Sequence, residues 1–136
     1  MRKESPIGCV PPDKTCVLIV DDDSALVGFL FSALVAEGFA LVAATDGQQA
    51  LDLLERGLRP HVILIDLGLP RVSGYDLLSY IRDDAALRTI PRIIITGSDK
   101  DDTRTVADAV FRKPIDHEKL ISTIRRLQHP VPRGAN

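Results

Sequence analysis

Five residues with charged or hydroxyl side chains stand at the ends of apolar stretches in this sequence: Asp21, Asp22, Asp66, Thr96 and Lys113. Three carboxylates within about 4 Å of one another repel by about 4 kcal/mol per pair at an effective dielectric constant of roughly 20. A fold keeps such a cluster only where a cation compensates. Hard carboxylate oxygens with no His or Cys nearby favour Mg²⁺ or Mn²⁺. The sequence therefore predicts a divalent metal site built on aspartates.

Asp66 is the residue to which we assign the central chemistry. It ends the apolar run 62–65, and Gly68 follows at once in a predicted loop. Lys113 would supply a fixed positive charge and Thr96 a hydroxyl donor, and both suit a phosphoryl group attached to Asp66. The predicted chemistry is attack by a carboxylate on phosphorus, where catalysis is mostly positioning and charge neutralisation.

Five apolar strands are needed to position these residues, and they are predicted at 16–20, 40–44, 62–65, 93–95 and 109–112. Stretches with apolar residues at helical spacing lie between them, so strands and helices alternate. This alternation predicts an α/β fold with a parallel sheet covered by helices on both faces. Because the carboxyl ends of parallel strands share one edge, the five polar residues are expected to converge there.

The predicted helices carry start and stop signals. Ser24 is expected to cap the first helix, which stops at Gly38. The second is predicted over 48–56, the third begins after Gly74, and Asp116 caps the last.

Length and composition limit the domain count and the class of protein. With 136 residues and 45% hydrophobic content, we expect one domain over 15–127, between a flexible arm at 1–14 and a loose tail at 128–136. A net charge of -2 and the absence of Trp argue against nucleic-acid binding. No apolar run is long enough to span a membrane or to export the chain. Cys9 and Cys16 lie in different settings and are expected to stay reduced, which predicts a cytoplasmic protein.

The sequence resembles the receiver domain of two-component response regulators over residues 15–127. The resemblance rests on Val20-Asp21-Asp22, Ile65-Asp66, Thr96-Gly97 and Lys113-Pro114, in this order. The spacings of 44 residues from Asp22 to Asp66 and of 30 from Asp66 to Thr96 also resemble that family's pattern. The resemblance implies a flavodoxin-like, doubly wound (βα)5 fold with five parallel strands in the order 2-1-3-4-5.

The resemblance also implies a function. Asp66 would accept phosphate from a histidine kinase or a histidine phosphotransfer protein. Asp22, Asp66 and the Gly68 carbonyl would hold Mg²⁺, Asp21 would act through a metal-bound water, and the Lys113-Pro114 bond would be cis. We expect a stand-alone receiver without enzymatic turnover of its own, which acts in a phosphorelay on a separate, unidentified partner.

The sequence departs from the family's pattern at two positions and in the length of one interval. The position three residues before the lysine usually holds Tyr or Phe, and here it holds Val110, with Phe111 beside it. The interval from Thr96 to Lys113 is short, so helix four of the family pattern is expected to be shortened to one turn or unformed. Gly68 lacks a side chain that would shield the phosphoryl group, so a short-lived phosphoryl-aspartate is expected.

The first helix carries a second apolar stripe besides its core positions. Val27, Phe31 and Val35 recur at four-residue spacing on a side expected to face solvent. By resemblance, this helix docks on the four-helix bundle of the phosphodonor, and an apolar stripe suits such docking. Partial burial of the stripe under the N-terminal arm explains the pattern equally well.

Two other functions remain open at this stage. A strand that ends in Asp21-Asp22-Asp23 also resembles haloacid-dehalogenase-type phosphatases, with Asp21 as nucleophile and Asp23 as general acid. The absence of a later acidic pair and of room for a substrate cap argues against this enzyme class. The second alternative is a pseudo-receiver, an interaction scaffold that is never phosphorylated. Incubation with acetyl phosphate and Mg²⁺ distinguishes the three.

Overall fold

The computed structural model describes residues 14–67, 74–97 and 107–128. Within these ranges it contains five strands, β1 (Cys16–Val20), β2 (Ala40–Ala44), β3 (Val62–Asp66), β4 (Arg92–Thr96) and β5 (Ala109–Arg112). All neighbouring strands are parallel, and their order across the sheet is β2-β1-β3-β4-β5. The predicted flavodoxin-like α/β topology is therefore confirmed.

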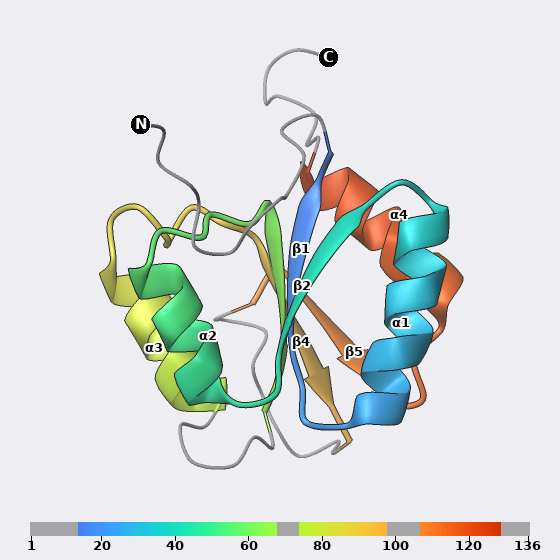
Figure 1. Cartoon of the computed structure of the whole chain (residues 1–136), viewed down its shortest axis with the longest axis horizontal. Coiled ribbons are helices and arrows are strands. Elements are labelled where there is room, and N and C mark those ends of the chain that lie inside the picture. The colour runs from blue at the N-terminus through green and yellow to red at the C-terminus, as the bar shows by residue number, and fades with distance from the viewer. Residues whose placement is uncertain (1–13, 68–73, 98–106, 129–136) are drawn as a thin grey trace, which may run out of the picture.

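Four helices of the described residues pack on the sheet, α1 (Ser24–Ala36), α2 (Gly47–Glu55), α3 (Gly74–Asp83) and α4 (His117–Gln128). Figure 1 shows α2 and α3 on one face and α1 with α4 on the other. Every residue of β1 and β3 is buried, because both strands lie inside the sheet and are covered on both sides.

The core consists of two apolar clusters separated by the sheet. Alternate residues of the strands point to opposite faces, so Leu18 and Ile63 belong to the cluster beneath α2 and α3. Val17 and Leu64 belong to the cluster beneath α1 and α4. A sheet packed in this way is rigid, and its strand ends are fixed platforms for polar side chains.

The helix starts differ from the predictions by one residue in two places. Asp23, rather than Ser24, caps α1, since its Oδ1 accepts a hydrogen bond from the Leu26 amide at 3.1 Å. Similarly, α2 begins at Gly47 because Asp46 caps it through the Gln49 amide at 2.8 Å. Asp116 accepts from the amides of the first turn of α4, as predicted.

Several sequence-based predictions fall outside the described residues. These are Gly68, most of the interval between Thr96 and Lys113 in which helix four of the family pattern is expected to be shortened, and nearly all of the predicted arm and tail. The described chain includes Gln128, which α4 contains although we expected the tail to begin there. In the part of the chain that is described, none of the helices has the length and apolar character needed to cross a membrane.

Candidate acidic site at the carboxyl edge of the sheet

The carboxyl ends of β1 and β3 bring three aspartates together. The register pairs Val20 with Ile65, so the residues that follow them, Asp21 and Asp66, leave the sheet at the same level. One carboxylate oxygen from each of Asp21, Asp22 and Asp66 lies within 4.8 Å of the others. The predicted convergence of these residues is therefore present in the structure.

Lys113 bridges the two buried carboxylates of this cluster. Its Nζ lies 3.4 Å from Asp21 Oδ2 and 3.5 Å from Asp66 Oδ2. Asp21 is 1% exposed and Asp66 is 7% exposed, whereas Asp22 faces solvent. A single ammonium group thus balances two carboxylates, which leaves the cluster short of positive charge.

The two oxygens of Asp21 have different surroundings. Oδ1 accepts a hydrogen bond from the Asp23 amide at 2.9 Å. Oδ2 is buried and accepts no hydrogen bond within the described chain, and it faces Lys113 Nζ at 3.4 Å as an ion pair. This buried oxygen therefore has the Lys113 ammonium as a charged neighbour but no hydrogen bond, so it is only partly compensated and can serve as a ligand for a cation.

The pKa values of the cluster reflect this imbalance. Burial raises the pKa of Asp21, and the nearby charge of Asp66 adds to the increase, while the Asp23 amide and Lys113 oppose it. Burial alone would lower the pKa of Lys113, but the charges of Asp21 and Asp66 outweigh it and raise that pKa. Lys113 therefore keeps its positive charge, whereas the charged form of Asp21 is disfavoured by its burial and by Asp66.

Thr96 and Lys113 reach the same edge from neighbouring strands. Thr96 is the last residue of β4, is 4% exposed, and lies opposite Arg112 in the register with β5. The Lys113 amide donates to the Thr96 carbonyl at 3.0 Å, which extends the strand pairing by one residue. The Lys113-Pro114 bond is cis, as the family resemblance predicted.

The donor set fits a hard divalent cation. It offers three carboxylates, one of which has a buried oxygen that lacks a donor, and no His or Cys of the described residues joins the group. Oxygen-only ligands of this kind suit Mg²⁺ or Mn²⁺. The carbonyl of Gly68, predicted as a further ligand, lies outside the described residues.

The predicted docking stripe on α1 is only partly exposed. Phe31 and Val35 are 44% and 46% exposed, whereas Val27 is half-buried against the cluster beneath α1 and α4. Sequence reasoning missed Phe29, which is 49% exposed and lies edge-on to the His117 ring at 5.3 Å. The exposed part of the predicted stripe is therefore made by Phe31 and Val35.

Sequence reasoning also missed the close approach of Gly74 to the acceptor strand. A Cβ on this residue would lie 2.7 Å from the Asp66 carbonyl oxygen and 2.8 Å from Leu67 Cα. The first turn of α3 can reach β3 only because position 74 has no side chain.

Comparisons with known proteins agree with the geometry. The model of the response regulator receiver domain matches residues 17–125. The polar-differentiation response regulator DivK of Brucella anthropi is 33% identical over 114 residues, which cover 80% of this chain and 92% of DivK. The DNA-binding response regulator MtrA of Mycobacterium tuberculosis is 35% identical over 116 residues, which cover 80% of this chain and only 48% of MtrA. The signal receiver domain of a histidine kinase from Syntrophus aciditrophicus has a TM-score of 0.76 at 30% identity, over 88% of this chain and 93% of that one.

Proposed function

The chain belongs to the response regulator receiver domain family, and on this premise we propose that Asp66 accepts a phosphoryl group from a histidine kinase or a histidine phosphotransfer protein. The observation that carries the proposal is the position of Lys113 Nζ, 3.4 Å and 3.5 Å from oxygens of Asp21 and Asp66. A lysine held there is placed to neutralise a phosphoryl group on Asp66.

The transfer would proceed by attack of an Asp66 carboxylate oxygen on phosphorus. An oxygen–phosphorus bond forms as the bond from phosphorus to the imidazole nitrogen of the donor breaks, and the electron pair leaves with that nitrogen. Lys113 would contact the phosphoryl oxygens, and the Thr96 hydroxyl would donate a hydrogen bond to one of them. No proton is removed from Asp66, since it is the carboxylate that reacts.

Asp21, Asp22, Asp66 and the Gly68 carbonyl are the residues that we assign to Mg²⁺ or Mn²⁺, with Asp21 acting through a bound water. The bound ion would supply positive charge beside the phosphoryl oxygens. This assignment is supported by the mutual proximity of the three carboxylates and by the buried Asp21 Oδ2 that lacks a donor.

The consequence of phosphorylation would be a changed affinity for a separate partner protein. Val110 is 37% exposed at the position where the family usually has an aromatic ring, so a ring movement at this position cannot report the change. We assign the docking of the phosphodonor to Phe31 and Val35 on α1, with a smaller part for the half-buried Val27. A cytoplasmic location fits such a partner and is supported by the buried, unpaired Cys16.

Acetyl phosphate with Mg²⁺ tests the proposal directly. We expect a mass increase of one phosphoryl group that is transient, requires the metal, and is absent from Asp66→Asn. Steady release of phosphate through Asp21, still present in Asp66→Asn, would instead indicate a phosphatase of the haloacid-dehalogenase type. No covalent change in the wild-type chain under conditions where a control receiver is labelled would identify a pseudo-receiver.

A further inference from the structure

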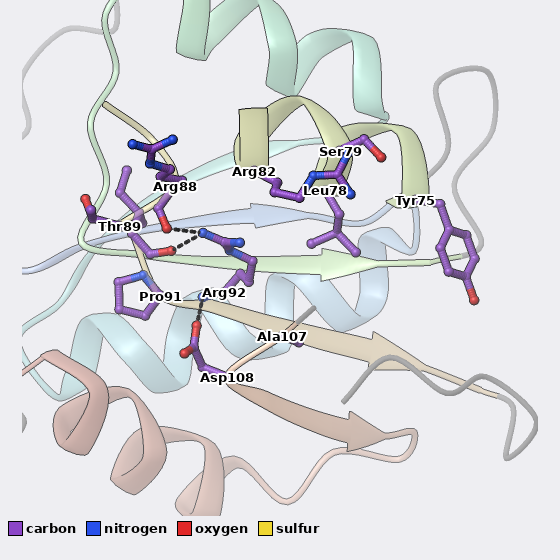
Figure 2. A pocket seen from close by; sticks show the side chains of 11 residues that line it. Tyr75, Leu78, Ser79, Arg82, Arg88, Thr89, Pro91, Arg92, Ala107 and Asp108 are labelled. Carbon is purple, nitrogen blue, oxygen red and sulfur yellow. Dashed lines mark hydrogen bonds between the residues drawn. The ribbon is translucent and has the colours of Figure 1, made fainter. Parts of the chain in front are cut away.

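A second polar site lies away from the aspartate cluster. A cavity of about 510 Å³ lies between α3 on one side and the loop before β4, the first residue of β4 and the residues before β5 on the other. Its main polar and aromatic lining residues are Tyr75, Arg82, Arg88, Thr89, Arg92 and Asp108. Figure 2 shows Arg82 on the side of α3 and Arg92 on the side of the sheet, with Tyr75 at the far end of α3. The volume lies within the range of pockets that bind small molecules.

This cavity is distinct from the proposed phosphoacceptor site. Arg92 is the first residue of β4 and Thr96 is the last. At about 3.3 Å per residue, the two ends of this strand are about 13 Å apart. A ligand held by Arg92 would therefore contact other residues than one held by Lys113.

The lining carries an excess of positive charge. Three arginines face one aspartate, which gives the cavity a formal charge of +2 in a chain whose net charge is -2. Asp108 is the one acidic residue in the lining, and its Oδ2 accepts a hydrogen bond from the Arg92 backbone amide at 2.9 Å rather than from a guanidinium group. Arg82 pairs with Asp83 through Nε at 3.0 Å, but both side chains are exposed and such a pair is weak.

Arg92 is held in place before any ligand arrives. Its Nη2 donates to the carbonyls of Arg88 and Ile90, at 2.6 Å and 3.2 Å. Figure 2 shows these two bonds fixing the guanidinium beside the cavity. Its Nε is buried and has no hydrogen-bond partner in the described part of the chain. A fixed guanidinium loses little conformational entropy on binding an anion.

The Arg88 side chain adds a further positive charge to the lining. It is exposed, and it forms no hydrogen bond or ion pair with the described residues. Leu78, Ile90 and Pro91 provide an apolar surface next to the arginines. The lining of the cavity thus combines positively charged side chains with apolar ones.

We propose that this cavity binds a small organic phosphate, with the phosphate on Arg88 and Arg92 and the apolar part against Leu78 and Pro91. A phosphate monoester carries a charge of about -1.5 to -2 at neutral pH, which balances the lining charge of +2. A monocarboxylate would leave half of that charge uncompensated. The proposal does not depend on phosphorylation of Asp66.

Phenyl phosphate is a suitable probe, titrated without divalent cations so that the aspartate cluster repels it. We expect backbone amide shifts in two-dimensional NMR spectra at α3 and at residues 88–92, with a dissociation constant of about 1 mM or lower. Benzoate tests the carboxylate class and inorganic phosphate tests the need for an apolar part. Both should bind at least about fivefold more weakly.

The arginine substitutions use Arg88→Gln with Arg126→Gln as the matched control. Arg126 is an exposed arginine on α4, which packs on the opposite face of the sheet. Arg88→Gln should weaken phenyl phosphate binding about tenfold, since a charge-assisted contact is lost, and Arg126→Gln should change it less than about twofold. Equal weakening by both variants, or shifts confined to residues outside the cavity, would overturn the site. Benzoate or inorganic phosphate binding as tightly as phenyl phosphate would overturn the ligand class.

Discussion

Gly74 at the start of α3 lies directly against the backbone of Asp66 at the end of β3. A Cβ at position 74 would lie 2.7 Å from the Asp66 carbonyl oxygen, and the next nearest atom is also backbone. These backbone atoms cannot move aside as easily as the end of a flexible side chain, because they continue a strand of the packed sheet. Gly74→Ala should therefore lower the free energy of unfolding by about 1–3 kcal/mol, measured by urea denaturation. Labelling of Asp66 by acetyl phosphate should slow in the same variant, because the strand end that carries the carboxylate must shift.

The matched control for this substitution is Gly28→Ala on α1. Nothing lies within 4 Å of a Cβ built at Gly28. Alanine is favoured over glycine inside a helix by about 1 kcal/mol, so Gly28→Ala should stabilise the protein. If Gly74→Ala were as stable as Gly28→Ala, the close approach would not limit the packing of α3.

The sequence predicted the strands and the polar residues at their ends because both signals are local. Runs such as 62–65 are apolar throughout and stop at a charged residue, and parallel topology alone then brings Asp21 and Asp66 to one edge. The cap of α1 was wrong by one residue because Asp23 and Ser24 are both good caps, and the backbone turn decides between them.

Other features depend on packing that no local pattern reveals. The approach of Gly74 to Asp66 follows from how closely α3 docks on the sheet. The cationic cavity joins Arg82 of α3 to Arg92 of β4, and each arginine alone is typical of a solvated surface. The half-burial of Val27 likewise reflects its contact with the core cluster rather than its spacing.

Asp21→Asn should stabilise the protein when divalent cations are removed with a chelator. Burial and the neighbouring Asp66 raise the pKa of Asp21, which means that the folded state disfavours its charged form relative to the unfolded chain. A neutral side chain of the same shape removes this cost while Lys113 keeps Asp66 as its partner, so the free energy of unfolding should rise by about 1 kcal/mol. Thermal unfolding of the wild type and the variant in chelator measures this gain.

The higher stability of Asp21→Asn should disappear when the same thermal unfolding is measured in Mg²⁺. The wild-type chain then has a cation that compensates its three carboxylates, whereas the variant has lost one of the residues that hold this cation. Asp52→Asn is the control, since Asp52 is an exposed aspartate of α2 that contacts Gln48. A variant at position 21 that is less stable than wild type in chelator would contradict the interpretation of the site as strained without a metal.

Cys16 should resist alkylation in the folded protein. It is 2% exposed, and burial raises the pKa of its thiol from 9.0 to about 11. At pH 8 this shift lowers the thiolate fraction about 100-fold, and burial also blocks the reagent. Iodoacetamide labelling of a Cys9→Ser variant, followed by mass spectrometry, should show reaction only after urea is added. Rapid labelling of the folded variant would mean that β1 opens readily.

Gly68→Met should prolong the lifetime of the phosphoryl group on Asp66. Position 68 lies two residues after the acceptor in the sequence, and glycine there offers no side chain to exclude water. A methionine side chain should slow hydrolysis several-fold by shielding the phosphorus from water. Decay of the labelled species after removal of acetyl phosphate gives the rate for both proteins. Equal decay rates would show that access of water does not depend on this position.

Substitution of Phe31 and Val35 should slow phosphotransfer from the donor protein without affecting the chemistry at Asp66. Both side chains are more than 40% exposed on α1, so the double variant Phe31→Ala/Val35→Ala should remain folded. Truncating apolar anchors at the centre of an interface typically costs more than about 1 kcal/mol each, which predicts a transfer rate at least about tenfold lower at limiting donor concentration. The rate of labelling by acetyl phosphate should not change, because this small donor makes no contact with α1.

Tyr75→Ala is the matched control, since Tyr75 is 47% exposed on α3, across the sheet from α1. Equal loss of transfer in Tyr75→Ala would place the donor on another face, and loss of acetyl phosphate labelling in the double variant would show that its effect is on the site itself.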